Sequence, residues 1–351
     1  MNIPNKSLDI FCGTGGVGKT TLATSRALWL AGQGKKVLLI TIDPAKRLKQ
    51  ILGLDENSAG KIVKSNLENQ NIQIDALLMN PSSTMERIAK KHKNTEVKKN
   101  RILEVLFRPY GGMNEIMAII EVENHISQSD YDTIVLDTPP GSHFLDFLQS
   151  CNKIKSFFAQ DFVQIFQYLG KKMEGQKDIK NTSSKIMGLL IGSGVKKLLS
   201  YLEKVTGKGF VEDFVDAIWT FFQLKESFLK ALDFQAELKR EDLVNWFLVT
   251  SVEHNKAKEA KELNQEVQNV VGQSTFTIVN KCSEELLLPA LEKIKDENLL
   301  KLVKFQIDRE TNTLDIVKTY SSNIYKFNEV SSPNPMEHVL ELTDGWNQHA
   351  K

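Results

Sequence analysis

Short runs of apolar and β-branched residues recur along the chain, separated by longer stretches with helical apolar spacing. Runs of this length between helical segments are typical of buried strands in βαβ units. The pattern predicts an α/β fold with a mainly parallel sheet flanked by helices. The predicted strands cover residues 8–12, 37–42, 72–79, 133–136, 247–252 and 275–280, with a last possible strand at 323–330.

The strand pattern stops between about residue 143 and residue 243. Apolar residues within 210–234 instead follow mostly three- and four-residue steps, which predicts helices. We therefore expect an inserted helical subdomain at 143–243, between two parts of one α/β domain, 1–142 and 244–351. Trp219 and Phe222 make the apolar stripe wider than one buried helix face needs. Two interpretations stay open: a subdomain that packs against itself, or a groove for a client or partner.

The composition favours a globular protein of the cytoplasm. The net charge is +1, from 45 basic and 44 acidic side chains, so no broad field attracts nucleic acid or an anionic membrane. No apolar run is long enough for a membrane span, and the first residues lack the apolar core of a signal peptide. The three cysteines, Cys12, Cys151 and Cys282, are far apart and form no CxxC, which suits a reducing compartment.

One motif carries strong chemical information. Residues 13–20 read GTGGVGKT, which satisfies GxxxxGK[ST], follows a predicted strand and opens a predicted helix. Glycines let backbone N–H groups curve around a phosphate, and the helix N-terminus adds positive charge. We expect Lys19 to reach the β- and γ-phosphates of a nucleotide and the Thr20 hydroxyl to bind Mg²⁺. The expected nucleotide-binding residues of this segment are Gly13, Thr14, Gly15, Gly16, Val17, Gly18, Lys19, Thr20 and Thr21.

Two aspartates follow predicted strands. Asp43 ends the strand at 37–42 and Asp137 ends the strand at 133–136. Ligands of parallel sheets bind at the carboxyl ends of the strands, so both carboxylates should meet the glycine loop there. We assign Asp137 to the Mg²⁺ site, which leaves Asp43 to orient or deprotonate the attacking water.

The order of motifs resembles a known family. GTGGVGKTT, TIDPAKRL at 41–48 and LDTPPGSHFLDFL at 136–148 look like the ArsA-type ATPases, which include the arsenite-pump ATPase and the guided-entry ATPase for tail-anchored membrane proteins. This family is related to MinD-like and nitrogenase-iron-protein-like nucleotide switches. The resemblance implies a P-loop NTPase fold, ATP and Mg²⁺ as ligands, and a nucleotide-bridged homodimer.

The resemblance also implies roles for single residues. Asp43 and Pro44 match switch I, whose aspartate activates water. Asp137, Thr138 and Pro140 match switch II, whose movement reports the γ-phosphate. Asn280, at the end of a predicted strand, matches the asparagine that reads the adenine.

Thr14 departs from the family pattern. Relatives usually carry a lysine at this position, which crosses the dimer interface to the partner's nucleotide. A threonine is short and uncharged, so the resemblance implies slow turnover unless another cation substitutes. Lys46 and Arg47, in the turn after Asp43, are the candidates for that substitution.

The sequence thus predicts a Mg²⁺-dependent ATP hydrolase that acts as a dimeric conformational switch for a hydrophobic client or membrane-protein partner. Two alternatives stay open: an ATPase subunit that energises an arsenite or anion pump, and a nucleotide-binding scaffold with little hydrolysis. The chain contains a single GxxxxGK[ST] motif, unlike the tandem arrangement of arsenite-pump ATPases, and its cysteines match no metalloid or zinc site.

Overall fold

The computed structural model describes residues 3–42, 46–53, 58–67, 72–91, 100–106, 113–146, 148–149, 204–205, 208–272 and 274–349. The chain divides into two compact units. The first comprises Met1–Met79, Val122–Gln149 and Gln235–Lys351, and the second comprises Asn80–Glu121 and Ser150–Phe234.

The first unit contains an eight-stranded sheet with the order β3-β4-β2-β5-β1-β6-β7-β8. The strands are β1 (Leu8–Gly13), β2 (Val37–Thr41), β3 (Ile62–Leu67), β4 (Ile72–Leu78), β5 (Thr133–Asp137), β6 (Val244–Ser251), β7 (Phe276–Cys282) and β8 (Ile324–Asn328). All neighbouring strands are parallel except β3 and β4. The predicted α/β fold with a mainly parallel sheet is confirmed.

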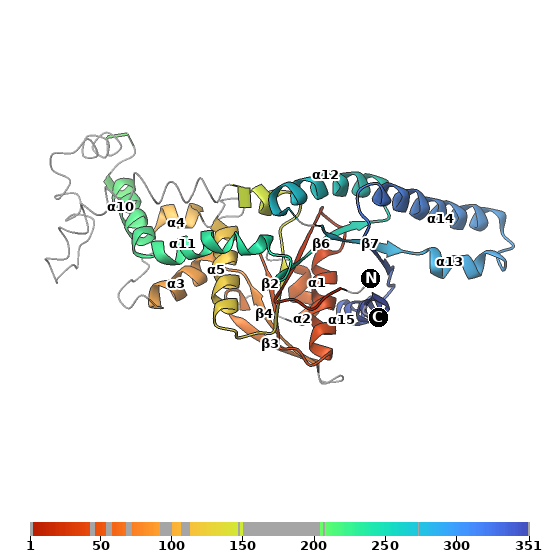
Figure 1. Ribbon diagram of the computed structural model, residues 1–351, viewed down its shortest axis with the longest axis horizontal. Helices are drawn as coiled ribbons and strands as arrows, with labels where there is room; N and C mark the ends of the chain where they lie inside the picture. The colour runs from red at the N-terminus through yellow and green to blue at the C-terminus, as the bar shows by residue number, and fades with distance from the viewer. Residues whose placement is uncertain are drawn as a thin grey trace. The chain divides into compact units, whose positions relative to one another are not determined.

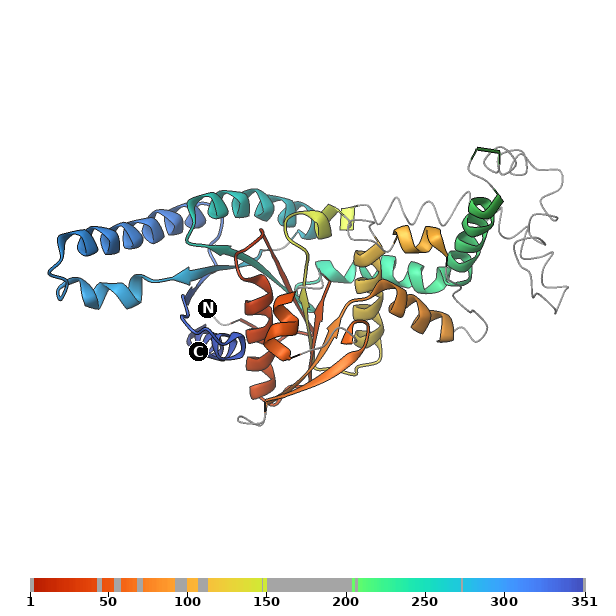
Figure 2. The same ribbon diagram turned by 180° about the vertical axis from the view of Figure 1, so that it is seen from behind.

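Helices cover both faces of this sheet. In both views, α1, α2 and α15 lie together on one side, and α12 lies beside α14 on the other (Figures 1 and 2). The described helices of the first unit are α1 (Lys19–Gly32), α2 (Lys46–Leu52), α12 (His254–Val271), α13 (Glu284–Leu291), α14 (Glu297–Lys318) and α15 (Pro335–His349), with a 3₁₀ turn at Glu237–Lys239. The second unit contains α3 (Pro81–Lys91), α4 (Arg101–Leu106), α10 (Lys208–Gln223) and α11 (Lys225–Phe234), and α5 (Met113–Ser127) crosses the boundary.

The strand register brings the ends of five strands to one edge of the sheet. Thr41 at the end of β2 pairs with Asp137 at the end of β5. Gly13 at the end of β1 pairs with Val249, and Ser251 at the end of β6 pairs with Asn280. Because these strands run parallel, their carboxyl ends form a common edge, where ligands of such sheets bind.

The described part of the region predicted to be a helical insertion, 143–243, includes α10, α11 and the 3₁₀ turn at Glu237–Lys239. The apolar pattern of 210–234 forms two helices and not one, because α10 ends at Gln223 and α11 begins at Lys225. Leu224, the residue that joins them, is fully buried. Phe228 is 1% exposed and its ring contacts that of Phe221, whereas Phe210 is 42% exposed. Most of the predicted insertion lies outside the described residues, so the boundaries 143 and 243 stay predictions.

Glu310 on α14 ties this helix to the start of α13. Its buried carboxylate accepts hydrogen bonds from the backbone nitrogens of Ser283 (2.6 Å) and Glu284 (2.9 Å), and Lys326 lies 3.1 Å away. Burial alone would raise the pKa of Glu310, but these two hydrogen bonds and Lys326 outweigh it and hold the pKa below the ordinary 4.5.

A carboxylate with a lowered pKa stabilises the fold above its ordinary pKa, and this contribution is lost as the pH falls through the lowered value. We therefore expect Glu310→Gln to lower the free energy of unfolding at neutral pH by about 1–3 kcal/mol, the value of hydrogen bonds to a charged group. The difference from the wild type should shrink as the pH falls below about 4.5. Urea unfolding at several pH values checks this, and a difference that grows towards acid pH would contradict it.

Candidate functional site

The loop between β1 and α1 carries the GxxxxGK[ST] motif, and two of its glycines have no room for a side chain. A Cβ atom on Gly13 would lie 2.3 Å from the carbonyl oxygen of Val249. A Cβ atom on Gly18 would lie 2.3 Å from Nδ2 of Asn280, and φ of Gly18 is +94°. Gly18 is the N-cap of α1 and contributes no side-chain cap, so the backbone N–H groups of the first turn can face a ligand. This loop and helix start fit a bound phosphate.

Lys19 lies against the same loop. Its Nζ atom donates a hydrogen bond to the carbonyl oxygen of Thr14 at 2.9 Å, and the residue is 8% exposed. Between them, Gly16 adopts φ +80° and Val17 is buried, while Gly15 is exposed. The ammonium group is therefore held at the loop, where it can pair with phosphate oxygens.

Asp137, at the end of β5, is hydrogen-bonded both to the start of α1 and to the end of β2. Its Oδ2 atom accepts hydrogen bonds from the hydroxyl of Thr20 at 2.7 Å and from the hydroxyl of Thr41 at 3.1 Å. Asp137 is 2% exposed. A buried carboxylate beside the hydroxyl of the phosphate-loop threonine is the donor set that such sites offer to Mg²⁺, directly or through water. Thr41 was not among the residues predicted from the sequence, although it begins the quoted TIDPAKRL.

The segment after β5 is bonded to the phosphate loop's own strand. Both the backbone nitrogen and the hydroxyl of Thr138 donate to the carbonyl oxygen of Phe11, at 3.2 Å and 2.8 Å. The backbone nitrogen of Gly141 donates to the carbonyl oxygen of Gly13 at 3.0 Å. Between them, Pro140 is exposed. A movement of residues 138–141 therefore requires hydrogen bonds at the base of the phosphate loop to change.

Asn280, near the end of β7, is hydrogen-bonded to the phosphate loop. Its Nδ2 atom donates to the carbonyl oxygen of Val17 at 2.9 Å, and the residue is 6% exposed. This contact uses one donor of the amide and leaves Oδ1 as the group that could accept a hydrogen bond from the amino group of adenine. Asn280 is therefore close to the loop, and its role as an adenine reader stays a prediction.

Lys281 is a site residue that the sequence reasoning missed. Its φ angle is +63°, a left-handed conformation that a residue with a side chain rarely adopts. Its Nζ atom donates to the carbonyl oxygen of Gly16 at 3.4 Å. Asn280 and Lys281 thus hold two successive carbonyl groups of the loop, so the neighbouring N–H groups keep their direction. Lys281 directly follows Asn280, which the sequence did point to, but the left-handed backbone conformation of the lysine cannot be read from the sequence.

We expect Lys281→Met to weaken ATP binding about 3- to 10-fold, because it removes roughly 1 kcal/mol of charged hydrogen bonding to the loop. Isothermal titration calorimetry with ATP and Mg²⁺ measures the effect. Lys293→Met is the matched control, since Lys293 is exposed and far along the sequence from the loop. Equal affinities of both variants would show that the Lys281 contact does not support nucleotide binding.

Several predicted residues fall wholly or partly outside the description. Asp43 and Pro44 lie outside the described residues, so their predicted roles stay predictions. Lys46 and Arg47 begin α2, but their side chains are not described. Thr21 is described and is 7% exposed in the first turn of α1.

Three properties of the described residues concern cysteine reactivity, metal-binding clusters and membrane-spanning helices. Cys12 is 2% exposed and its thiol donates to the carbonyl oxygen of Phe247, and burial raises its pKa to about 12. Cys12 therefore behaves as a small apolar residue of the core. Within the described ranges, no group of three or more His, Cys, Asp or Glu side chains is placed to bind a metal ion. In the same ranges, no helix has the length and apolar character needed to cross a bilayer.

Known proteins resemble this chain over part of its length. ATPase GET3 of Malassezia globosa is 30% identical over 181 residues, which cover 49% of this chain and 53% of the relative. ATPase GET3 of Mycosarcoma maydis is 29% identical over 161 residues, 46% of each protein. A protein named as arsenical pump-driving ATPase 2, from Aquifex aeolicus, is 29% identical over 172 residues, 47% of this chain and 56% of the relative. The chain spans about half the length of the curated relatives it matches.

The parallel sheet, the glycine loop and the Thr20–Asp137 pair define a protein of the P-loop nucleotide-binding class. The family model described as anion-transporting ATPase matches residues 8–216 of the 351. The chain belongs to this family, and the resemblance noted from the motifs is confirmed.

Proposed function

We propose that the chain is a Mg²⁺-dependent ATP hydrolase that works as a homodimeric conformational switch. The observation that carries this proposal is the hydrogen bond from Thr20 to Asp137 beside the phosphate loop. When bound, Mg²⁺ neutralises charge on the β- and γ-phosphate oxygens. Thr20 and Asp137 would hold the ion, Lys19 would neutralise the phosphates, and Asp43 would orient or deprotonate the water.

The bonds from Thr138 and Gly141 to the strand of the loop support the switch part of the proposal. A change at the phosphates reaches residues 138–141 through Phe11 and Gly13. We propose that this change controls an apolar surface of the helical block at 143–243. The 42% exposed Phe210 on α10 is consistent with a hydrophobic client segment or membrane-protein partner.

The proposed hydrolase differs from a nucleotide-binding scaffold in its dependence on Asp43. Asp43→Asn keeps the size of the side chain but removes the charge that activates water. We expect the variant to bind ATP like the wild type and to release phosphate at least about 100-fold more slowly. Phosphate release that is equally slow in both proteins would favour the scaffold.

An arsenite-stimulated function has less support. Cys12 and Cys282 are buried free thiols, and burial raises the pKa of each, so neither offers a thiolate to a metalloid. Arsenite stimulation that disappears when all three cysteines are replaced would reverse this preference.

A further inference from the structure

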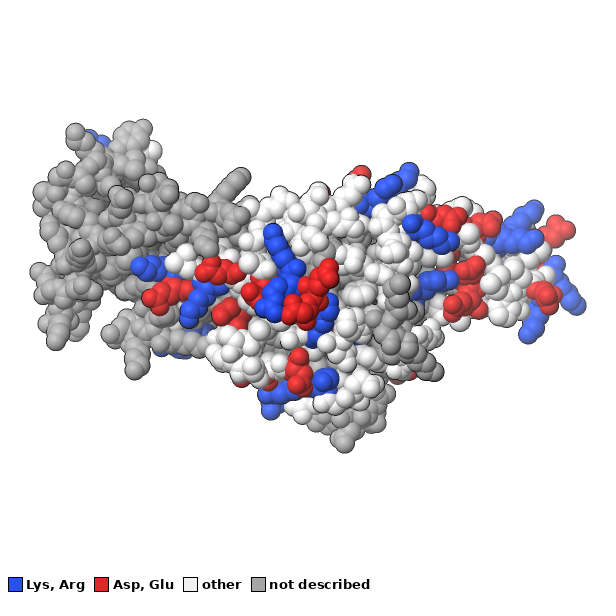
Figure 3. All heavy atoms as spheres, in the orientation of Figure 1, with Lys and Arg blue, Asp and Glu red and all other residues white. Residues whose placement is uncertain are grey.

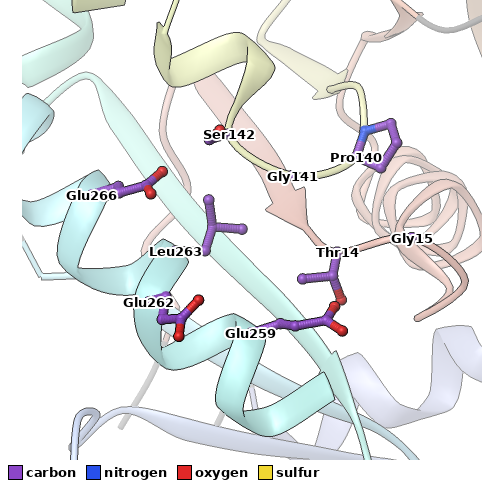
Figure 4. Close-up of a pocket in the computed structure, with 9 residues that line it drawn as sticks. All are labelled: Thr14, Gly15, Pro140, Gly141, Ser142, Glu259, Glu262, Leu263 and Glu266. Atoms are coloured by element: carbon purple, nitrogen blue, oxygen red, sulfur yellow. The ribbon is translucent and has the colours of Figure 1, made fainter. Parts of the chain in front are cut away.

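A pocket of about 360 Å³ opens beside the phosphate loop, and its size is within the range of small-molecule sites. Figure 4 shows Thr14 and Gly15 on one side, residues 140–142 on a second side and α12 on the third. All of these segments belong to the first unit. None of the nine residues that line the pocket is a lysine or arginine. On the face of the molecule in Figure 3, by contrast, acidic and basic side chains are interspersed.

Helix α12 makes its side of the pocket acidic. Glu259, Glu262 and Glu266 are three and four residues apart, so they lie on one face of the helix and line the pocket together. Glu259 pairs with Lys256 at 2.9 Å. Glu262 and Glu266 form no ion pair with any described residue. Like charges at this spacing repel each other, so a ligand that brings positive charge would stabilise this face.

Thr14 gives a second, independent sign of a ligand. The residue is 8% exposed, and its hydroxyl is buried without a hydrogen-bond partner among the described residues. Figure 4 shows this hydroxyl pointing towards Glu259 on the pocket side of the loop. A buried hydroxyl without a partner is costly, because its bonds to water are lost and not replaced. An N–H donor from a ligand in the pocket would satisfy it.

The spacing of the three carboxylates decides which kind of cation fits. A helix rises about 1.5 Å per residue, so Glu259 and Glu266 start about 10 Å apart along α12. A divalent metal ion holds its oxygen ligands within about 2.6 Å, so one ion at either end of this row leaves the other end unpaired. Accordingly, the described part of the chain contains no group of three or more His, Cys, Asp or Glu side chains placed to bind a metal ion. A flexible chain with two or more ammonium groups can reach along the whole row.

We propose that this pocket binds a small aliphatic polyamine. Its ammonium groups pair with Glu262 and Glu266, the two carboxylates without an ion pair among the described residues. Each ammonium group has three donors and no acceptor, so one of them can also donate to the hydroxyl oxygen of Thr14. Leu263 and Pro140 line the same pocket and offer apolar surface to the methylene groups between the charges. The pocket thus provides the charge, the hydrogen-bond acceptor and the apolar contact that this class of ligand needs.

The ligand would lie against residues 140–142, which are hydrogen-bonded to the phosphate loop through Gly141 and Gly13. A bound polyamine would therefore hold this segment beside α12 and restrain the movement that we propose for it. This consequence rests on the proposed function, whereas the binding itself does not.

Isothermal titration calorimetry of the full chain with putrescine, a diamine with four methylene groups, tests the proposal. No nucleotide is added, because ammonium groups also pair with the phosphates of ATP. We expect a dissociation constant below about 1 mM at low salt. n-Butylamine has the same carbon chain with a single ammonium group, and we expect it to bind at least about 10-fold more weakly, because it leaves one of the two carboxylates unpaired.

Three variants assign the contacts. Glu262→Gln/Glu266→Gln should weaken putrescine binding about 10-fold or more, because it removes both charges and keeps the size of the side chains. Glu337→Gln/Glu341→Gln is the matched control, since these exposed glutamates have the same spacing on α15, and its affinity should stay within about twofold of the wild type. Thr14→Val removes only the hydroxyl and should weaken binding about 3- to 10-fold.

Equal putrescine affinities of the Glu262→Gln/Glu266→Gln variant and the wild type would overturn the proposal. So would equal affinities of the wild type for putrescine and n-butylamine. Binding of Mg²⁺ or K⁺ that is lost in this double variant, with no binding of putrescine to the wild type, would show a metal-ion site and would also overturn it. Phosphate release from ATP is measured separately, and its absence would refute the proposed hydrolase while leaving the polyamine site intact.

Discussion

Asp137→Asn is expected to slow Mg²⁺-dependent ATP hydrolysis by about 100- to 1,000-fold, the usual effect of removing one preorganised electrostatic group. An asparagine oxygen can still accept hydrogen bonds from Thr20 and Thr41, so the fold should be kept while the negative charge is lost. Without that charge, the proposed Mg²⁺ site would offer the ion only the neutral oxygens of Thr20 and the asparagine, which bind it more weakly than a carboxylate does. Steady-state phosphate release as a function of Mg²⁺ concentration measures the change.

Asp132→Asn is the matched control, because Asp132 is exposed and precedes the opposite end of the same strand. Its rate should stay within about twofold of the wild type, as for most surface substitutions. If Asp137→Asn keeps the wild-type rate and the wild-type Mg²⁺ dependence, Asp137 has no part in the metal site.

Asp9→Asn is expected to lower the free energy of unfolding by about 3–5 kcal/mol, the cost of removing one partner of a buried ion pair. Asp9 and Arg26 are 0% and 1% exposed, and their side chains meet at 2.9 Å. Asn245 donates a further hydrogen bond to Asp9 at 2.7 Å. The guanidinium group also lies over the rings of Trp29 and Trp346. Loss of the carboxylate charge leaves this guanidinium buried without its counter-ion.

Urea unfolding of Asp9→Asn and of the double variant Asp9→Asn/Arg26→Met checks the cause. The double variant should lose less stability than the single variant, because methionine leaves no uncompensated charge in the core. If Asp9→Asn alone is as stable as the wild type, the Asp9–Arg26 ion pair contributes little to the stability of the fold.

The sheet was largely predictable, because six of its strands are short runs rich in apolar and β-branched residues, most of them buried. The possible last strand, β8, is also present. β3 was not predicted, since Lys64, Ser65 and Asn66 interrupt its apolar pattern and it pairs antiparallel at the edge of the sheet. Strand order was beyond reach, because it depends on contacts between residues far apart in sequence.

The phosphate loop could be predicted because its residue types are dictated by local geometry, as the crowded positions of Gly13 and Gly18 show. Thr41 and Lys281 could not, since one is defined by a hydrogen bond across 96 residues and the other by a left-handed backbone.

The proposed ATP hydrolysis is tested by the release of phosphate from ATP by the wild-type chain in Mg²⁺ and in excess EDTA, compared with Lys19→Ala. We expect slow but measurable release in Mg²⁺, none above background in EDTA, and a rate at least about 1,000-fold lower for Lys19→Ala. If the wild type releases phosphate no faster than Lys19→Ala at saturating ATP and Mg²⁺, the chain is not an ATP hydrolase that uses this phosphate loop.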